Sequence, residues 1–121
     1  MFLLFYLEPK KMNLPDIDDE NFKLLTQITE VLATVIDPEL QVNILDLGMV
    51  YNVAVKNETK TIEVEMTLST RHCPMGSAIV NSVENAILQN FTTYSPVVNL
   101  VWEPAWNVNS ITPEGKKQLG V

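Results

Sequence analysis

The sequence predicts an α+β domain of two layers, with the element order α-β-β-α-β-α and a three-stranded mixed sheet. Three observations predict this fold class. An apolar pattern of helical period comes first in the chain. Two stretches that alternate between apolar and polar residues then flank a polar turn. The second of these stretches is followed by the pattern of a helix and then by a further strand. The 121 residues, 46% of them hydrophobic, suffice for one core but not for two, so we expect a single domain over residues 16–121.

The first helix is expected over roughly residues 19–36, because apolar side chains recur there at helical spacing after a run of acidic residues. Pro38 ends it, since the residue before a proline is pushed away from helical backbone angles. Residues 37–48 show neither a helical nor a strand period, and we expect an ordered loop there.

An antiparallel hairpin follows this loop. In its first strand, residues 49–55, one face carries Met49, Tyr51, Val53 and Val55. After a polar turn at residues 56–60, the second strand alternates cleanly over residues 61–68. Its apolar face carries Ile62, Val64, Met66 and Leu68, and its wet face carries Thr61, Glu63, Glu65 and Thr67.

The remaining elements are a helix, a strand and a helix. A second helix is expected after Cys73 and up to about residue 90, with a buried stripe of Met75, Ile79, Val83, Ala86 and Ile87. A turn at residues 94–96 precedes a third strand over residues 97–102, which a crossover connection places parallel to the second strand. Thr112 and Pro113 are typical of a helix start, so a short last helix is expected to run to about Leu119, before Gly120.

The charge balance excludes one class of partner. Fifteen acidic residues face eight basic ones, which gives a net charge of −7, whereas a nucleic-acid interface needs a basic face. We therefore expect no nucleic acid among the partners. A single cysteine cannot form an internal disulfide, and no export signal is evident, so a cytoplasmic location is expected.

Residues 1–7 form an apolar run that is too short to cross a bilayer, and no membrane association is expected. Two interpretations stay open. Met12 is a plausible alternative start, which would make residues 1–11 an upstream extension; the other interpretation is a β-prone arm that pairs with a sheet edge or a neighbouring chain. Residues 1–15 are expected to be an N-terminal extension, partly disordered.

The only cysteine, Cys73, lies where the second strand runs into a helix start, with Pro74 suited to the first helical position. The unpaired amides and the positive end of a helix dipole favour a thiolate there, and Arg71 adds to the effect. The alternative is a buried cysteine that packs as a small hydrophobe. The position alone does not separate the two.

Other sites that could use this cysteine are incomplete. His72 is adjacent in sequence, so its side chain diverges from the thiol and a protease-like pair is not expected. Zinc and iron–sulfur sites need about four ligands, and the chain offers one thiolate. No glycine-rich phosphate loop is present. Any iron or cluster bound at Cys73 must therefore be shared between subunits, completed by an outside thiol or carboxylate, or held transiently during transfer.

Four further residues have structural explanations beside functional ones. Asp37 is expected to cap a short turn begun by Pro38, and Asp46 to bond to the backbone near Gly48. Trp102 is expected to anchor the core, while Trp106 is either a rim aromatic or part of a partner surface.

The chain resembles the MIP18 family, the domain of unknown function 59 group, over roughly residues 22–121. The resemblance is carried by Asp37-Pro38-Glu39-Leu40, the run from Asn43 to Tyr51, Met66 to Thr70 before Cys73-Pro74, and Val101 to Pro104 with Trp106. Arg71 and His72 stand where relatives often have small residues or proline. The chain also lacks the extra cysteines of PaaD-like members, which favours the SufT-like branch.

The resemblance implies a fold like that of iron–sulfur cluster assembly domains and a non-enzymatic role in iron–sulfur protein maturation, with the reactive cysteine at Cys73. The implied partners are an assembly scaffold or apo client proteins, and a homodimer would bring a second thiol. The residues expected to shape the site are Asp37, Glu39, Asp46, Ser69, Thr70, Arg71, His72 and Pro74.

Two alternatives are retained. One is a thiol-dependent enzyme in which Asp46 or Asp37 serves as the base or as an orienting group. The other is an adaptor that binds a multicomponent oxygenase or a scaffold through the region from Trp102 to Trp106, with Cys73 merely packed.

Overall fold

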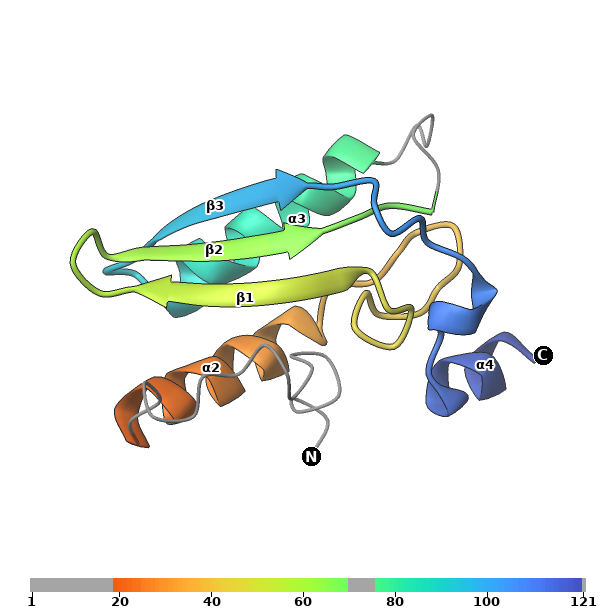
Figure 1. The fold of residues 1–121 in the computed structure, drawn as a ribbon. Coiled ribbons are helices and arrows are strands. Elements are labelled where there is room, and N and C mark those ends of the chain that lie inside the picture. The colour runs from red at the N-terminus through yellow and green to blue at the C-terminus, as the bar shows by residue number, and fades with distance from the viewer. Residues whose placement is uncertain (1–18, 70–75, 121) are drawn as a thin grey trace.

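The computed structural model describes residues 19–69 and 76–120. Its elements are α2 (Asp19–Leu32), β1 (Val50–Lys56), β2 (Thr61–Met66), α3 (Gly76–Asn90), β3 (Ser95–Leu100), the 3-10 helix η3 (Val108–Ser110) and α4 (Pro113–Leu119) (Figure 1). The predicted order α-β-β-α-β-α is confirmed, with η3 as an addition. No helix in the described ranges is both long and apolar enough to cross a membrane.

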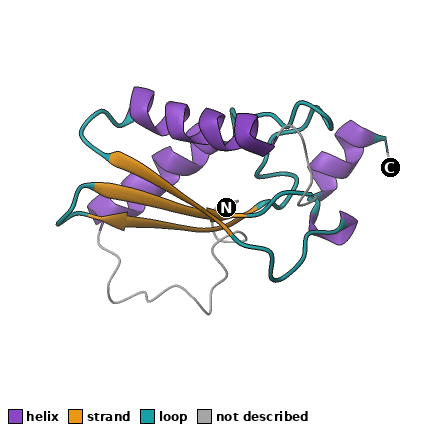
Figure 2. Ribbon diagram, turned by 90° about the horizontal axis from the view of Figure 1, so that it is seen from above, coloured by secondary structure: helices purple, strands orange, loops and turns teal. Residues whose placement is uncertain are grey.

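The sheet has the strand order β1-β2-β3, with β1 antiparallel to β2 and β2 parallel to β3. This confirms the hairpin and the parallel crossover. The helices α2 and α3 lie on the same side of the sheet (Figure 2), where α2 packs against β1 and α3, and α3 packs against β3. The predicted two-layer α+β fold with a mixed sheet is therefore confirmed.

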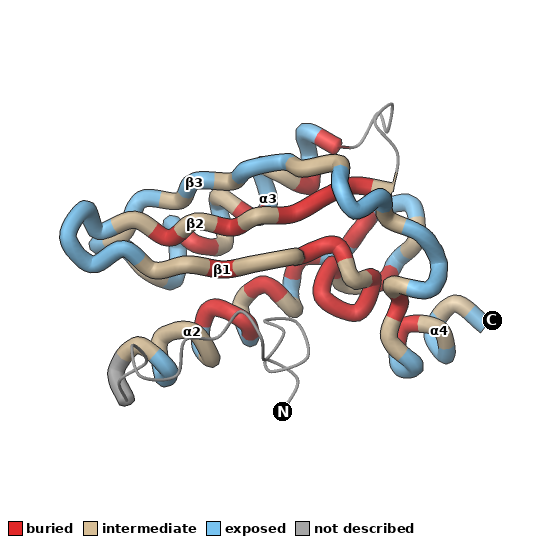
Figure 3. Tube along the Cα trace, in the orientation of Figure 1, coloured by how far each residue is buried: buried red, intermediate tan, exposed pale blue. Residues whose placement is uncertain are grey.

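The core lies between this helical layer and the sheet (Figure 3). The helix α3 contributes Ile79, Val83 and Ile87 to it, as its spacing predicted, with Ala86 partly buried. Met75, the other residue predicted for this stripe, lies outside the described residues. The central strand β2 contributes Ile62, Val64 and Met66, all fully buried. The loop after α2 adds Val42, Ile44, Leu45 and Leu47. A segment without regular period thus supplies much of the core at one end of the sheet.

The first helix ends at Leu32, four residues before the predicted end at residue 36. A tighter turn follows, in which the amide of Thr34 donates to the carbonyl of Val31, and the Thr34 hydroxyl donates to the same carbonyl at 2.6 Å. Hydroxyl and β-branched side chains compete with helical hydrogen bonding in this way. Ile36 then forms an isolated antiparallel bridge with Asn43. Strand pairing therefore replaces the last predicted turn of helix.

The hairpin departs from strict alternation at its far end. Val50 pairs with Met66, but Asn52 pairs with Glu65, so Tyr51 lies at a β-bulge. The bulge places Val50, rather than Tyr51, opposite a buried residue. Thr67, predicted to face water, is fully buried, because β2 ends at Met66 and the alternation ends with it.

The third strand begins at Ser95 and ends at Leu100, two residues earlier than predicted at both ends. Pro96 therefore lies inside it. An edge strand tolerates a proline because one row of its amides has no partner strand. The last helix agrees with the prediction: the Thr112 hydroxyl accepts from the Gly115 amide at 3.0 Å, and Gly120 ends α4 with a φ of 78°.

Candidate functional site

The predicted thiol site lies at the junction between β2 and α3. Cys73 lies outside the described residues, as do Thr70, Arg71, His72 and Pro74. The chain on both sides of the junction is described. Ser69 is half-buried after the end of β2, and Gly76 is buried at the start of α3.

The start of α3 packs closely on the chain that leaves β2. A Cβ atom at Gly76 would lie 2.7 Å from Cδ1 of Leu68, closer than real contacts allow. Glycine therefore lets the first helical residue approach this buried leucine. The first residues of α3, Gly76, Ser77 and Ala78, are all small, which is typical of such a close approach.

Asp37 is 1% exposed and holds the short turn that begins at Pro38. Its Oδ1 accepts hydrogen bonds from the amides of Glu39 at 2.7 Å and Leu40 at 3.1 Å. This confirms the predicted cap. Its Oδ2 is buried and meets no donor in the part of the chain that the structure describes. Asp37 thus keeps one acceptor atom that the described fold does not use, whereas the side chain of Glu39 is exposed.

The loop of Asp37 also borders a pocket of about 210 Å³. The pocket lies between this loop and the first half of α3, and it is lined by Ile36, Pro38, Ala78, Ile79 and Ser82. Sequence reasoning placed Asp37 in a loop and predicted the helix α3, but it did not bring the two together. The pocket shows that the acidic loop lies against the helix that follows the cysteine.

Asp46 is almost fully buried, and its partners differ from the predicted ones. Its Oδ2 accepts from Nδ2 of Asn43 at 2.8 Å, and its Oδ1 accepts from the hydroxyl of Thr112 at 3.0 Å. The amide of Thr112 also donates to the carbonyl of Asp46 at 2.8 Å. The predicted bond to the backbone near Gly48 is therefore wrong. Asp46 instead joins its own turn to the start of α4.

Gly48 brings the C-terminal segment onto this turn. Its φ is 73°, and a Cβ atom there would lie 2.1 Å from the carbonyl oxygen of Ser110. The indole Nε1 of Trp106 donates to the carbonyl of Leu47 at 2.6 Å. Both Trp102 and Trp106 pack against the core, as predicted for the first of them. The indole N–H of Trp106 is therefore already hydrogen-bonded within the fold.

Tyr51, at the bulge, also contacts the C-terminal segment. Its hydroxyl donates to the carbonyl of Pro104 at 2.7 Å, next to the cis peptide bond between Glu103 and Pro104. Burial raises the pKa of the Tyr51 phenol above its ordinary value of 10.0, and the negative charge of Glu103 raises this pKa further.

Backbone hydrogen bonds join these parts at one end of the sheet. The amide of Ile44 donates to the carbonyl of Val35, and the amide of Met49 donates to the carbonyl of Ile44. The amide of Thr67 then donates to the carbonyl of Met49 at 2.8 Å. The loop after α2, the start of β1 and the exit from β2 therefore lie together, at the end where the parallel strands β2 and β3 finish (Figure 1).

Within residues 19–69 and 76–120, no three histidine, cysteine, aspartate or glutamate side chains come close enough to hold a metal ion.

The comparisons with known proteins agree on one family. The family model described as iron–sulfur cluster assembly protein matches residues 25–90. The chain is 39% identical over 87 residues to the Fe–S protein maturation auxiliary factor SufT of Staphylococcus aureus (strain USA300), which covers 72% of this chain and 98% of that protein.

Two further relatives are informative. A crystal structure of a domain of unknown function, DUF59, from Bacillus anthracis has a TM-score of 0.74 and 33% identity, covering 79% of this chain and 91% of that one. A component of the putative 1,2-phenylacetyl-CoA epoxidase of Escherichia coli (strain K12) is 34% identical, covering 77% of this chain but 55% of that protein.

Proposed function

Because the chain belongs to the iron–sulfur cluster assembly protein family, we propose that it acts as an auxiliary, non-enzymatic factor in the maturation of iron–sulfur proteins. The observation that carries the proposal is the range of the family match. Residues 25–90 contain the Asp37 loop, Asp46, Ser69 and Cys73. The family likeness therefore includes the junction at which the sequence places its only thiol.

We propose that Cys73 supplies one thiolate ligand to iron or to a cluster that passes between an assembly scaffold and an apo client. Thiolate is the ligand type that iron–sulfur clusters use, and one thiolate is too few to retain a cluster. The remaining ligands come from the partner or from a second copy of the chain. The cargo is thus bound weakly enough to be passed on.

The polar residues around the junction support this role in different ways. The hydroxyl of Ser69 lies on the exit from β2, where it can donate a hydrogen bond to a bound sulfur or carboxylate. Asp37 offers its unused Oδ2 as an acceptor for a donor that comes from outside the described fold. Asp46 has both carboxylate oxygens engaged, so it supports the turn and does not serve as a free base. This disfavours Asp46, but not Asp37, as the base of a thiol-dependent enzyme.

The adaptor of the kind suggested by the epoxidase component is the weaker alternative. The indole N–H of Trp106 already bonds to Leu47, which leaves only part of this side chain for a partner. The partial coverage of that relative also limits the analogy.

Genetic complementation tests the proposal. In cells that lack this protein, we expect Cys73→Ala and Cys73→Ser to fail to restore the activity of an iron–sulfur enzyme, while wild type and Asn85→Ala restore it. Asn85 is a suitable control because it lies exposed on α3 and does not line the pocket beside Asp37. Thermal unfolding of each purified variant checks that the fold is intact. Full restoration by both cysteine variants would overturn the proposal.

Anaerobic reconstitution tests the cargo directly. Wild-type protein incubated with iron and sulfide should retain more of both than Cys73→Ala after rapid desalting. Equal retention by the two proteins would contradict a ligand role for the thiol, whatever the result in cells.

A further inference from the structure

The strand β3 forms an open edge of the sheet. Within the described residues, β3 pairs with β2 on one side and has no strand on the other. Such an edge presents a row of backbone amides and carbonyls that can pair with another chain. Val97 and Leu100 on this strand are 38% and 39% exposed.

The two edges of the sheet are not protected equally. The edge strand β1 carries a bulge and ends in the exposed Lys56, and bulges and lysines are common devices against unwanted pairing. The sequence of β3, SPVVNL, contains no charged residue. Its only protection within this sequence is Pro96, at the second position, so the four positions from Val97 to Leu100 remain suited to pairing.

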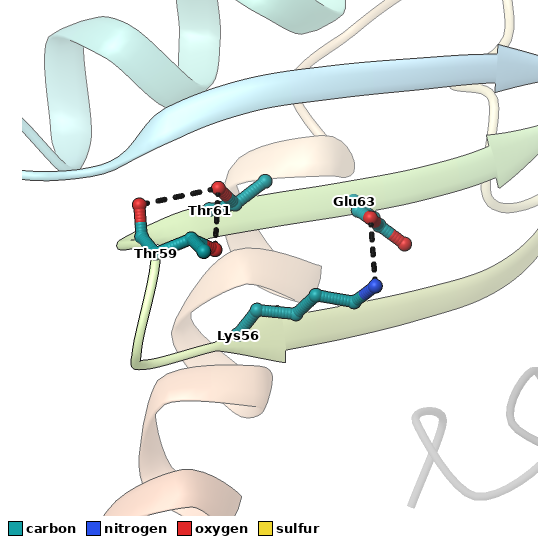
Figure 4. Close-up of polar contacts among 4 residues, drawn as sticks. All are labelled: Lys56, Thr59, Thr61 and Glu63. Carbon is teal, nitrogen blue, oxygen red and sulfur yellow. Dashed lines mark hydrogen bonds and ion pairs between the residues drawn. The ribbon is translucent and has the colours of Figure 1, made fainter.

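Acidic residues lie beside this edge on the sheet face away from the helices. The register places Val97 next to Glu63 and Asn99 next to Glu65. Glu63 forms an ion pair with Lys56 at 3.1 Å (Figure 4). Glu65 lies between Asn52 and Asn99, so its cross-strand neighbours carry no positive charge. The chain as a whole has a net charge of −7.

We propose that β3 binds an extended, basic segment of a partner protein as a fourth strand. Backbone pairing with β3 would supply the attachment, and the exposed Leu100, on the face of Met66, would contact apolar side chains of the segment. A lysine or arginine on the opposite face, that of Glu65, would lie two strand spacings, about 9–10 Å, from the backbone at Glu65, which two long side chains together span. The carboxylate of Glu65 therefore selects for positive charge.

The open edge of β3 lies near the junction that carries Cys73, but binding at this edge does not depend on the proposed function. Because β3 is parallel to β2, both strands finish at the end of the sheet where Ser69 and the start of α3 lie. A segment bound to β3 can therefore place the rest of its protein near the junction that carries Cys73. Binding itself needs only β3 and the acidic face.

Fluorescence anisotropy with labelled peptides tests the proposal at low salt. The probe is a short peptide of alternating valine and lysine. Its first control keeps the lysines but replaces alternate valines with proline, which removes backbone donors while keeping the charge. We expect the probe to bind and to shift the backbone amide signals of Val98 and Leu100, whose N–H groups the register turns away from β2, in nuclear magnetic resonance spectra. We expect the proline peptide to bind at least about tenfold more weakly.

Protein variants test the acid and the edge separately. Glu65→Gln should weaken binding about two- to fivefold, while Glu58→Gln, in the exposed turn between β1 and β2, should change it by less than that. Val97→Lys should weaken it further, because it adds a repelling charge to the edge. Cys73→Ala should bind the probe as wild type does, even if it fails in maturation.

Equal binding of the two peptides would overturn the inference, and so would equal effects of the two glutamate substitutions or amide shifts that avoid β3. A reduced affinity of Cys73→Ala would also overturn it, because the peptide would then occupy the thiol junction.

Discussion

The hydroxyl of Thr112 donates to the carboxylate of Asp46 at 3.0 Å, although the two residues are 66 positions apart in the chain. The same hydroxyl accepts the amide of Gly115 and so caps α4. One side chain thus joins the last helix to the turn that precedes β1.

Replacing Thr112 by valine should lower the free energy of unfolding by about 1–3 kcal/mol, because it removes both the cap and a hydrogen bond to a buried acid. Thr112→Ser keeps the hydroxyl and should lose less than about 1 kcal/mol. Urea unfolding of the three proteins makes the comparison. A valine variant as stable as wild type would show that the contact with Asp46 contributes nothing.

Gly48→Ala should be much more damaging than Gly120→Ala. Both glycines have a positive φ, at 73° and 78°, so both substitutions strain the backbone by about 1 kcal/mol. At Gly48 the added Cβ also meets the carbonyl of Ser110, whereas at Gly120 nothing lies within 4 Å. The overlap should cost at least about 1–3 kcal/mol more. Thermal unfolding measures the difference, and similar melting temperatures would contradict it.

Asp37→Ala and Asp37→Asn separate structure from function at the acidic loop. Alanine removes both hydrogen bonds to the turn and should cost about 1–3 kcal/mol of unfolding free energy. Asparagine keeps an oxygen for these bonds but replaces Oδ2 by a donor. We expect it to retain more stability than alanine and still to impair maturation in cells. Full maturation with Asp37→Asn would show that Oδ2 has no functional partner.

Tyr51 should contribute to the fall in stability at alkaline pH. Its pKa is raised in the folded protein, so the unfolded chain loses this proton first as the pH rises. The stabilising contribution is complete below the unfolded value of about 10 and is lost as the pH rises toward the folded value. The absorbance of wild type and of Tyr51→Phe should be titrated separately. The difference between the two curves should show one phenol that ionises above a pH of about 10.

Two variants refine this result. Tyr51→Phe should remove part of the alkaline destabilisation, at the expense of the bond to Pro104. Glu103→Gln should bring the Tyr51 pKa partly back toward its ordinary value, with the effect of burial remaining. A Tyr51 phenol that ionises at the ordinary pH in wild type would contradict the whole assignment.

Local patterns were enough to predict the elements of this fold. The wet face of β2, the buried stripe of α3 and the cap of α4 depend on neighbouring residues, and all three were identified, apart from Thr67 at the end of β2. The cap at Asp37 is also local, since its donors lie two and three residues on.

The differences arise from contacts between distant segments. The bulge at Tyr51 follows from pairing with β2 and coincides with a bond to Pro104, 53 residues away. The partner of Asp46 could not be read from its neighbours for the same reason. The first helix ends early because Ile36 pairs with Asn43. The apolar periodicity of the sequence does not reveal this competition between strand pairing and helix formation. The open acceptor on Asp37 and the pocket beside it need coordinates to be seen.

The attachment of the C-terminal segment to the turn at Asp46 also sets an order of assembly. Closing a loop of 66 residues costs more chain entropy than closing the hairpin between β1 and β2. The hairpin can form as soon as its strands exist, while the carboxylate of Asp46 lacks its second donor until Thr112 has been synthesised. During translation the turn at Asp46 therefore gains its last hydrogen bond only after the start of the final helix has been synthesised. A nascent chain completes its sheet before it completes the candidate site.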